Sequence, residues 1–179
     1  LWPDRIRFAA DIARGLTFLH TLPDNIVHQD VKTANILIAA ATDDCPCQVA
    51  KLADFGTVRT TRKLTDATHV QTENIVGTRP YWAPEYFQQG HVSVKTDAYA
   101  FGVVLLEVLT GCRVIDPHTK VALATKLGPV LDDPDKLLRP ELDSRAGRWP
   151  HQAVQEARKL AVIASQLLEP RPYRRVTVQ

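Results

Sequence analysis

Three polar residues with complementary chemistry lie within residues 28–38, which read HQDVKTANILI. Asp30 supplies a carboxylate, Lys32 a cation and Asn35 an amide oxygen, and the apolar residues that follow can anchor them as a buried strand. Phosphoryl transfer needs a carboxylate near the attacking hydroxyl, a cation near the phosphate and an oxygen ligand for magnesium. The stretch has the residue types for that reaction. The same short pattern also occurs in capped surface turns that carry a solvated charge pair.

Two further motifs follow this stretch along the chain. Residues Asp54, Phe55 and Gly56 come directly after a short apolar segment, and residues 77–85 read GTRPYWAPE. Together with residues 28–38, they resemble the catalytic loop, the Asp-Phe-Gly motif and the Ala-Pro-Glu motif of the protein kinases, which occur in this order. Taken alone, Asp54 would be an Asp in a strand-end turn before glycine.

The kinase resemblance implies a role for each of these polar residues. Asp30 would be the catalytic base, Lys32 would contact the transferred phosphate, and Asn35 and Asp54 would bind magnesium. ATP would be the phosphate donor, bound through Lys32, Asn35 and Asp54. Structural or regulatory roles are implied for a further set of family positions, which are His28, Gln29, Phe55, Gly56, Thr78, Glu85, Asp97 and Arg175.

An ion pair between two distant residues is implied near the C-terminal end. In the family, the Glu of Ala-Pro-Glu pairs with the Arg of a Pro-x-x-Arg-Pro segment, which here gives Glu85 and Arg175. Val176 stands where that segment has its second proline. The alternative is that Arg175 belongs, with Arg171 and Arg174, to a solvated basic cluster.

Two further contacts are expected around the catalytic loop. Asp97 would bind backbone groups of this loop, although an Asp near the start of a helix can also be a plain N-cap. The hydroxyl of Thr78 would face Asp30. Gln29 departs from the family, in which many members have Arg at this position. That Arg pairs with a phosphorylated residue of the activation segment, whereas a neutral amide cannot form such a charge-assisted bidentate contact.

Residues 57–75 are polar and rich in threonine. The resemblance assigns them to the activation segment, whereas the alternative is a solvated loop whose threonines have no role. Since Gln29 lacks the charge of Arg, phosphorylation here is expected to matter little. Replacing the threonines at 60, 61, 65, 68 and 72 with Ala should change activity by less than about tenfold, roughly 1.4 kcal/mol.

Apolar patterns predict the elements that position these residues. The predicted elements are a helix over about residues 4–20, strands at 36–38 and 49–53, a helix over 97–109 and a helix over 151–168. The helix over 97–109 is apolar around almost its whole circumference, which indicates complete burial, and Gly111 is expected to cap its end. The sequence ARGLTFLH at residues 13–20 resembles the receptor-like and Pelle group of kinases.

Composition limits the classes of protein and partner. The 179 residues are 45% hydrophobic and 23% charged, which suits one globular domain with a sizeable core. A net charge of +2 is too small to indicate nucleic acid or an anionic membrane as partner, and no apolar run approaches the roughly 18 residues of a membrane span. Three cysteines cannot form a disulfide framework. A cytoplasmic location is expected, or the intracellular part of a membrane receptor.

We therefore expect a mainly α fold with a few short β-strands, in which residues 1–179 are the C-terminal lobe of a protein kinase whose N-terminal lobe is absent. Complete kinases carry a Gly-rich loop and a strand lysine upstream of the catalytic loop, and residues 1–27 do not contain them. The expected activity is transfer of the ATP γ-phosphate to Ser or Thr of a protein substrate, with the isolated chain inactive. Lys32 favours this class over the tyrosine kinases.

Two other functions compete with this interpretation. A pseudokinase or scaffold would use the same fold to bind protein partners, but here the four catalytic positions Asp30, Lys32, Asn35 and Asp54 are intact. A small-molecule phosphotransferase of related fold would share a His-x-Asp loop but should lack the features found between residues 54 and 85.

Overall fold

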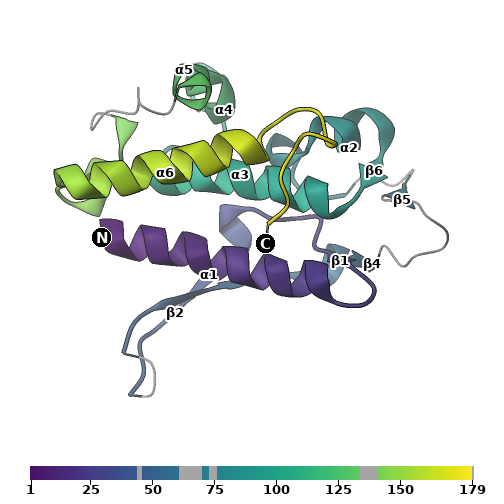
Figure 1. The fold of residues 1–179 in the computed structure, drawn as a ribbon, viewed down its shortest axis with the longest axis horizontal. Coiled ribbons are helices and arrows are strands. Elements are labelled where there is room, and N and C mark those ends of the chain that lie inside the picture. The colour runs from purple at the N-terminus through teal and green to yellow at the C-terminus, as the bar shows by residue number, and fades with distance from the viewer. Residues whose placement is uncertain (44–45, 61–69, 73–75, 134–140, 179) are drawn as a thin grey trace.

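The computed structural model describes residues 1–179 except 44–45, 61–69, 73–75, 134–140 and 179. The helices are α1 (Trp2–Thr21), α2 (Pro84–Gln89), α3 (Val94–Thr110), α4 (Leu123–Lys126), α5 (Gly128–Asp132) and α6 (His151–Leu167). The strands are β1 (Ile26–Val27), β2 (Ile36–Ala39), β3 (Val49–Leu52), β4 (Arg59–Thr60), β5 (Val70–Gln71) and β6 (His91–Val92). Strands β1 to β5 follow α1 along the described chain, and helices dominate the C-terminal half, where only β6 lies between α2 and α3 (Figure 1). The mainly α fold with short strands is confirmed.

Helix α3 forms the centre of the core. Apolar residues occur around its whole circumference, so most of its side chains are buried. Helix α6 packs along α3, and α1 contacts both helices (Figure 1). Gly102 permits this close packing, because a Cβ at this position would lie 2.9 Å from Cγ of Leu168.

The start of α3 differs from the predicted boundary. Ser93 is the N-cap, and its Oγ accepts a hydrogen bond from the backbone N–H of Lys95 at 3.1 Å. Asp97 therefore lies inside the helix, and its interpretation as an N-cap is wrong. Because the Ser93 hydroxyl caps the first turn, the Asp97 carboxylate is available to other partners. The helix ends as predicted, with Gly111 in the left-handed region at φ 64.

The strands form three antiparallel pairs in the described part of the chain, β1 with β4, β2 with β3, and β5 with β6. The register of β2 and β3 runs from Ile36 opposite Leu52 to Ala39 opposite Val49. Directly after this pairing, the N–H of Ala53 donates to the carbonyl of Asn35 at 2.8 Å. The pairing therefore brings residue 54 beside the catalytic loop.

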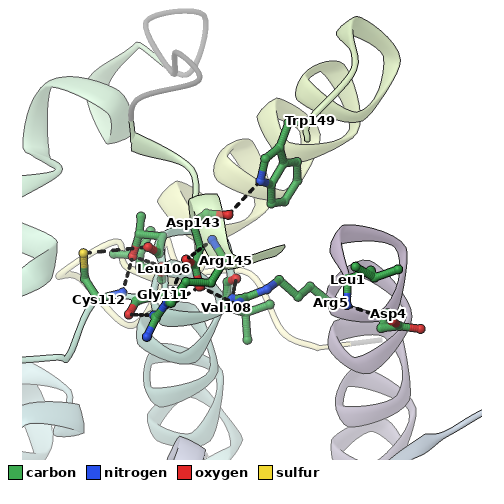
Figure 2. A network of polar contacts seen from close by, with 11 residues as sticks. Leu1, Asp4, Arg5, Leu106, Val108, Gly111, Cys112, Asp143, Arg145 and Trp149 are labelled. Carbon is green, nitrogen blue, oxygen red and sulfur yellow. Dashed lines mark hydrogen bonds and ion pairs between the residues drawn. The ribbon is translucent and has the colours of Figure 1, made fainter. Parts of the chain in front are cut away.

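A buried carboxylate joins the end of α3 to the start of α1 (Figure 2). Asp143 is 5% exposed and accepts hydrogen bonds from the guanidinium groups of Arg5 and Arg145. Arg5 also donates to the carbonyl of Val108 at 2.6 Å, and Trp149 Nε1 donates to the Asp143 carbonyl at 3.0 Å. The network fixes a segment in which the sequence shows only helix-breaking residues and short helical pieces.

No helix in the described residues is both long and apolar enough to cross a membrane.

Candidate active site

The carboxylate of Asp97 holds the backbone of the catalytic loop. This side chain is 1% exposed and accepts hydrogen bonds from the backbone N–H of His28 at 2.7 Å and of Gln29 at 2.9 Å. His20 Nε2 lies 2.9 Å from the same carboxylate. Gln29 adopts the left-handed region at φ 68, which costs a non-glycine residue conformational energy. The bonds to Asp97 hold the backbone in this shape.

Asp30 lies at the centre of a cluster formed by two separate segments. Its Oδ2 accepts from Lys32 Nζ at 2.6 Å and from Asn35 Nδ2 at 3.0 Å. Its Oδ1 accepts from the hydroxyl of Thr78 at 2.9 Å, and the same hydroxyl accepts from Lys32 Nζ at 2.8 Å. The structure thus brings together Asp30, Lys32, Asn35 and Thr78, as the sequence predicted.

The hydrogen bonds decide the charge state of Asp30. Burial alone would raise its pKa, but the bonds from Lys32, Thr78 and Asn35 outweigh burial and lower the pKa below the usual value. Asp30 is therefore a carboxylate at neutral pH. A carboxylate of lowered pKa is a weak base, so this geometry suits orientation of a substrate hydroxyl better than early removal of its proton.

Each member of the cluster keeps capacity for a further partner. A carboxylate offers about four lone-pair sites, and three bonds to Asp30 side-chain oxygens are described. Lys32 uses two of its ammonium N–H groups within the described residues. Asn35 directs its amide nitrogen at the carbonyl and the side chain of Asp30, which leaves its Oδ1 as the atom that could bind a cation.

The Asp-Phe-Gly segment lies against the catalytic loop. His28 Nε2 lies 3.1 Å from the carbonyl of Ala53, and the ring of Phe55 lies 5.2 Å from the ring of His28. Asp54 is exposed and adopts the left-handed region at φ 64, and its Oδ1 accepts from the N–H of Gly56 at 3.3 Å. The neighbouring Ala53 is hydrogen-bonded to the carbonyl of Asn35, and the Asp54 carboxylate accepts a bond within its own turn.

Magnesium fits the donors that these residues offer. It prefers oxygen ligands and is commonly bound by one or two carboxylates, with waters and substrate phosphates completing the octahedron. Asn35 offers an amide oxygen and Asp54 an exposed carboxylate. Among the described residues, no group of three or more His, Cys, Asp or Glu could enclose a metal.

The end of the activation segment approaches the catalytic loop at Gly77. A Cβ at this residue would lie 2.7 Å from the carbonyl oxygen of Gln29, and φ is +95. Glycine is therefore required for the close approach that places Thr78 beside Asp30. Residues 61, 65 and 68, which belong to the predicted threonine set, lie outside the described residues.

A second polar cluster connects the catalytic loop to α3. The carboxylate of Glu107 accepts from the hydroxyl of Tyr81 at 2.7 Å, from the hydroxyl of Thr33 at 3.1 Å and from the backbone N–H of Val114 at 3.0 Å. Burial raises the pKa of Glu107, and these bonds only partly oppose it. Thr33 lies between Lys32 and Asn35 along the chain, so the cluster holds the catalytic loop directly.

We expect Tyr81→Phe to lower the free energy of unfolding by about 1.5–3 kcal/mol at neutral pH, because the charged Glu107 loses a donor. Without that donor, the pKa of Glu107 rises further. A group whose folded pKa exceeds its unfolded value stabilises the fold at low pH, and this stability is lost as pH rises through the folded pKa. The loss should therefore be larger at neutral than at acidic pH.

Urea unfolding at acidic and neutral pH measures this dependence. Tyr173→Phe is the matched control, because Tyr173 is 76% exposed and its hydroxyl should contribute little. An equal loss for Tyr81→Phe at both pH values would contradict a role for the charge on Glu107.

The predicted pair of Glu85 and Arg175 is present. Arg175 donates from its two terminal nitrogens to the two carboxylate oxygens of Glu85, at 2.6 and 3.0 Å. Arg175 is 1% exposed and Glu85 is 7% exposed. Arg171 and Arg174 are exposed, so the solvated cluster describes these two residues but not Arg175.

Several residues of the site were not predicted from the sequence. His20, Thr33, Tyr81 and Glu107 each bond a predicted element. Thr33 and Tyr81 lie within the motifs at residues 28–38 and 77–85, but the motif pattern gives neither of them a role. In the sequence, His20 stands out only as the last residue of the ARGLTFLH segment. Tyr81 lies four residues before Glu85, and this spacing does not indicate that Tyr81 bonds Glu107 on α3.

Comparisons with known proteins agree with this geometry. A family model described as protein kinase domain matches residues 3–179. The probable serine/threonine-protein kinase PBL11 of Arabidopsis thaliana is 40% identical over 166 residues, which are 91% of this chain and 40% of the relative. The serine/threonine-protein kinase BIK1 of Arabidopsis thaliana is 36% identical over 180 residues, 99% of this chain and 43% of the relative.

A third relative comes from Nicotiana benthamiana. It is an EPD1-interacting receptor-like cytoplasmic serine/threonine-protein kinase, 35% identical over 183 residues, which are 99% of this chain and 36% of the relative. The chain spans about two fifths of the length of the curated relatives it matches.

Proposed function

The chain belongs to the protein kinase domain family, and we propose that it forms the C-terminal lobe of a serine/threonine protein kinase. The whole protein would transfer the γ-phosphate of ATP to Ser or Thr of a protein substrate. The observation that carries this proposal is the cluster of Asp30, Lys32, Asn35 and Thr78, in which an ammonium group, an amide N–H and a hydroxyl all donate to one carboxylate.

The roles follow from the capacity that each side chain retains. Asp30 orients the substrate hydroxyl with its remaining lone pair. It receives the proton as the substrate oxygen bonds to the γ-phosphorus and the bond from that phosphorus to the departing ADP oxygen breaks. Lys32, partly exposed, offers an N–H to the transferred phosphoryl group. Asn35 and Asp54 hold magnesium, which supplies positive charge that offsets the charge on the phosphate oxygens when it is bound.

The relatives support a cytoplasmic location and the serine/threonine kinase class for this protein. The relatives are named serine/threonine-protein kinases, and one of them is named receptor-like and cytoplasmic. We extend both properties to this protein. An intracellular part of a membrane receptor is the other location compatible with a kinase domain of this group.

We expect the whole protein, but not residues 1–179 alone, to transfer phosphate. Kinase catalysis is mostly positioning and electrostatic stabilisation of the nucleotide, and the Gly-rich loop and strand lysine that supply part of this are not in the chain. The assay uses labelled ATP, magnesium and a generic protein substrate, followed by identification of the labelled amino acid.

In this assay the whole protein and the isolated residues 1–179 serve as controls for each other. Label on Ser or Thr with the whole protein supports the proposal, and label on Tyr would contradict the substrate class. Transfer by residues 1–179 alone would contradict the assignment to a single lobe. No transfer by a folded whole protein that still binds nucleotide would favour a pseudokinase or scaffold.

A further inference from the structure

A small, partly open cavity lies between the catalytic loop and the end of the activation segment. Its lining includes Gln29 and Asp30 from the loop, Thr78 and Trp82 from the segment, and Asp97 from α3. The centre of a water molecule could occupy a volume of about 10 Å³ in this cavity. A single water molecule needs about 10–15 Å³ by this measure, so the size of the cavity matches that of one water molecule.

Unpartnered polar atoms are concentrated on this cavity. Four buried side-chain polar atoms lack a hydrogen-bond partner within the described chain, namely His20 Nδ1, Gln29 Nε2, Gln29 Oε1 and Trp82 Nε1. The last three belong to two residues that line the cavity. A buried polar group without a partner costs about 1–3 kcal/mol, so two adjacent residues left in that state need an explanation.

We propose that this cavity is a hydration site that holds one ordered water between Gln29 and Trp82. An indole N–H can only donate, so the water accepts from Trp82 Nε1. The Gln29 amide offers both donors and an acceptor, so the water can bond it with either end. The carboxylates of Asp30 and Asp97 also line the cavity and give a remaining water proton an acceptor.

The site connects the two segments that meet at Asp30. Gln29 directly precedes Asp30, and Trp82 lies four residues after Thr78. A Cβ built at Gly77 would lie 2.7 Å from the Gln29 carbonyl and 3.3 Å from Trp82 Nε1, so the cavity adjoins the closest approach of these segments. The water therefore bridges the loop and the segment beneath the hydrogen bond from Thr78 to Asp30.

A high-resolution crystal structure of the whole protein tests the site directly. The expected result is an ordered water within hydrogen-bond distance of Trp82 Nε1 and of the Gln29 amide. An empty cavity, or a Gln29 amide turned to bond protein atoms, would overturn the proposal.

Gln29→Leu provides a second test, in which the sign of the effect decides. If the cavity is dry, the substitution removes two unpartnered polar atoms, and stability stays the same or rises. If water occupies it, the substitution removes the bonds to that water and leaves Trp82 Nε1 without a partner. We then expect the folding equilibrium constant of the whole protein to fall about tenfold.

The comparison is made against Gln88→Leu, because Gln88 is exposed and should change this constant by no more than about twofold. Glutamine and leucine are both unbranched at Cβ, so the left-handed backbone of residue 29 should affect them similarly. Unchanged or increased stability of Gln29→Leu relative to this control would refute the hydration site. The measurement does not depend on phosphate transfer.

Discussion

Arg175→Ala is expected to lower the free energy of unfolding by about 3–5 kcal/mol, because it leaves the buried carboxylate of Glu85 without its partner. The two residues are 90 positions apart and form a bidentate pair. The remaining guanidinium N–H groups donate to the carbonyls of Glu169 at 2.8 Å, Lys95 at 2.9 Å and Pro170 at 3.2 Å. One side chain thus joins α2, α3 and the segment after α6.

The expected loss is a large share of the roughly 5–15 kcal/mol that stabilises a domain. Urea unfolding curves of three variants measure it. Arg174→Ala is the matched control, because Arg174 is exposed and should cost under about 0.5 kcal/mol. Arg171→Ala should cost a similarly small amount, because its pair with Glu169 is at the surface.

Arg175→Lys separates charge from geometry. Lysine keeps the positive charge but cannot donate five hydrogen bonds in the planar arrangement of a guanidinium. We expect a free energy of unfolding between those of the wild type and Arg175→Ala. Equal stability of Arg174→Ala and Arg175→Ala would show that net charge at this end of the chain, and not the buried pair, stabilises the fold.

The most predictable parts of the fold were those with a single physical solution. A helix that is apolar on all sides, such as α3, can only be buried, so the sequence placed it at the centre of the core. Glu85 and Arg175 lie in short motifs whose spacing relates them to family positions, and the structure pairs them. The cluster around Asp30 was predicted for the same reason.

The contacts that the sequence did not predict depend on packing between distant segments. His20 lies at the end of α1, and its partner Asp97 is 77 residues away. Glu107 faces the catalytic loop only because α3 packs behind it, and an isolated Glu on an apolar helix gives no sign of its partners. The side chain of Asp54 is set by a left-handed turn that motif spacing does not specify.

Asp30→Asn in the whole protein is expected to lower the rate of phosphate transfer by about 10²–10⁴-fold, because a positioned carboxylate contributes about that much to catalysis. The amide retains an oxygen that can accept from Lys32 or Thr78, so the loop should remain folded. Nucleotide affinity in the presence of magnesium should stay within about twofold, since Asp30 acts on the substrate hydroxyl and not on the metal.

Asp54→Asn should give the opposite pattern, because the proposed role of Asp54 is to bind magnesium. Removal of this carboxylate should weaken magnesium-dependent nucleotide binding by at least about tenfold, or roughly 1.4 kcal/mol. Nucleotide titrations with and without magnesium, paired with transfer rates, separate the two variants, and exposed Asp132→Asn is the control for loss of one negative charge. An equal fall in nucleotide affinity for Asp30→Asn and Asp54→Asn would contradict both roles, because a carboxylate that orients a hydroxyl and one that binds a cation cannot have the same effect on binding.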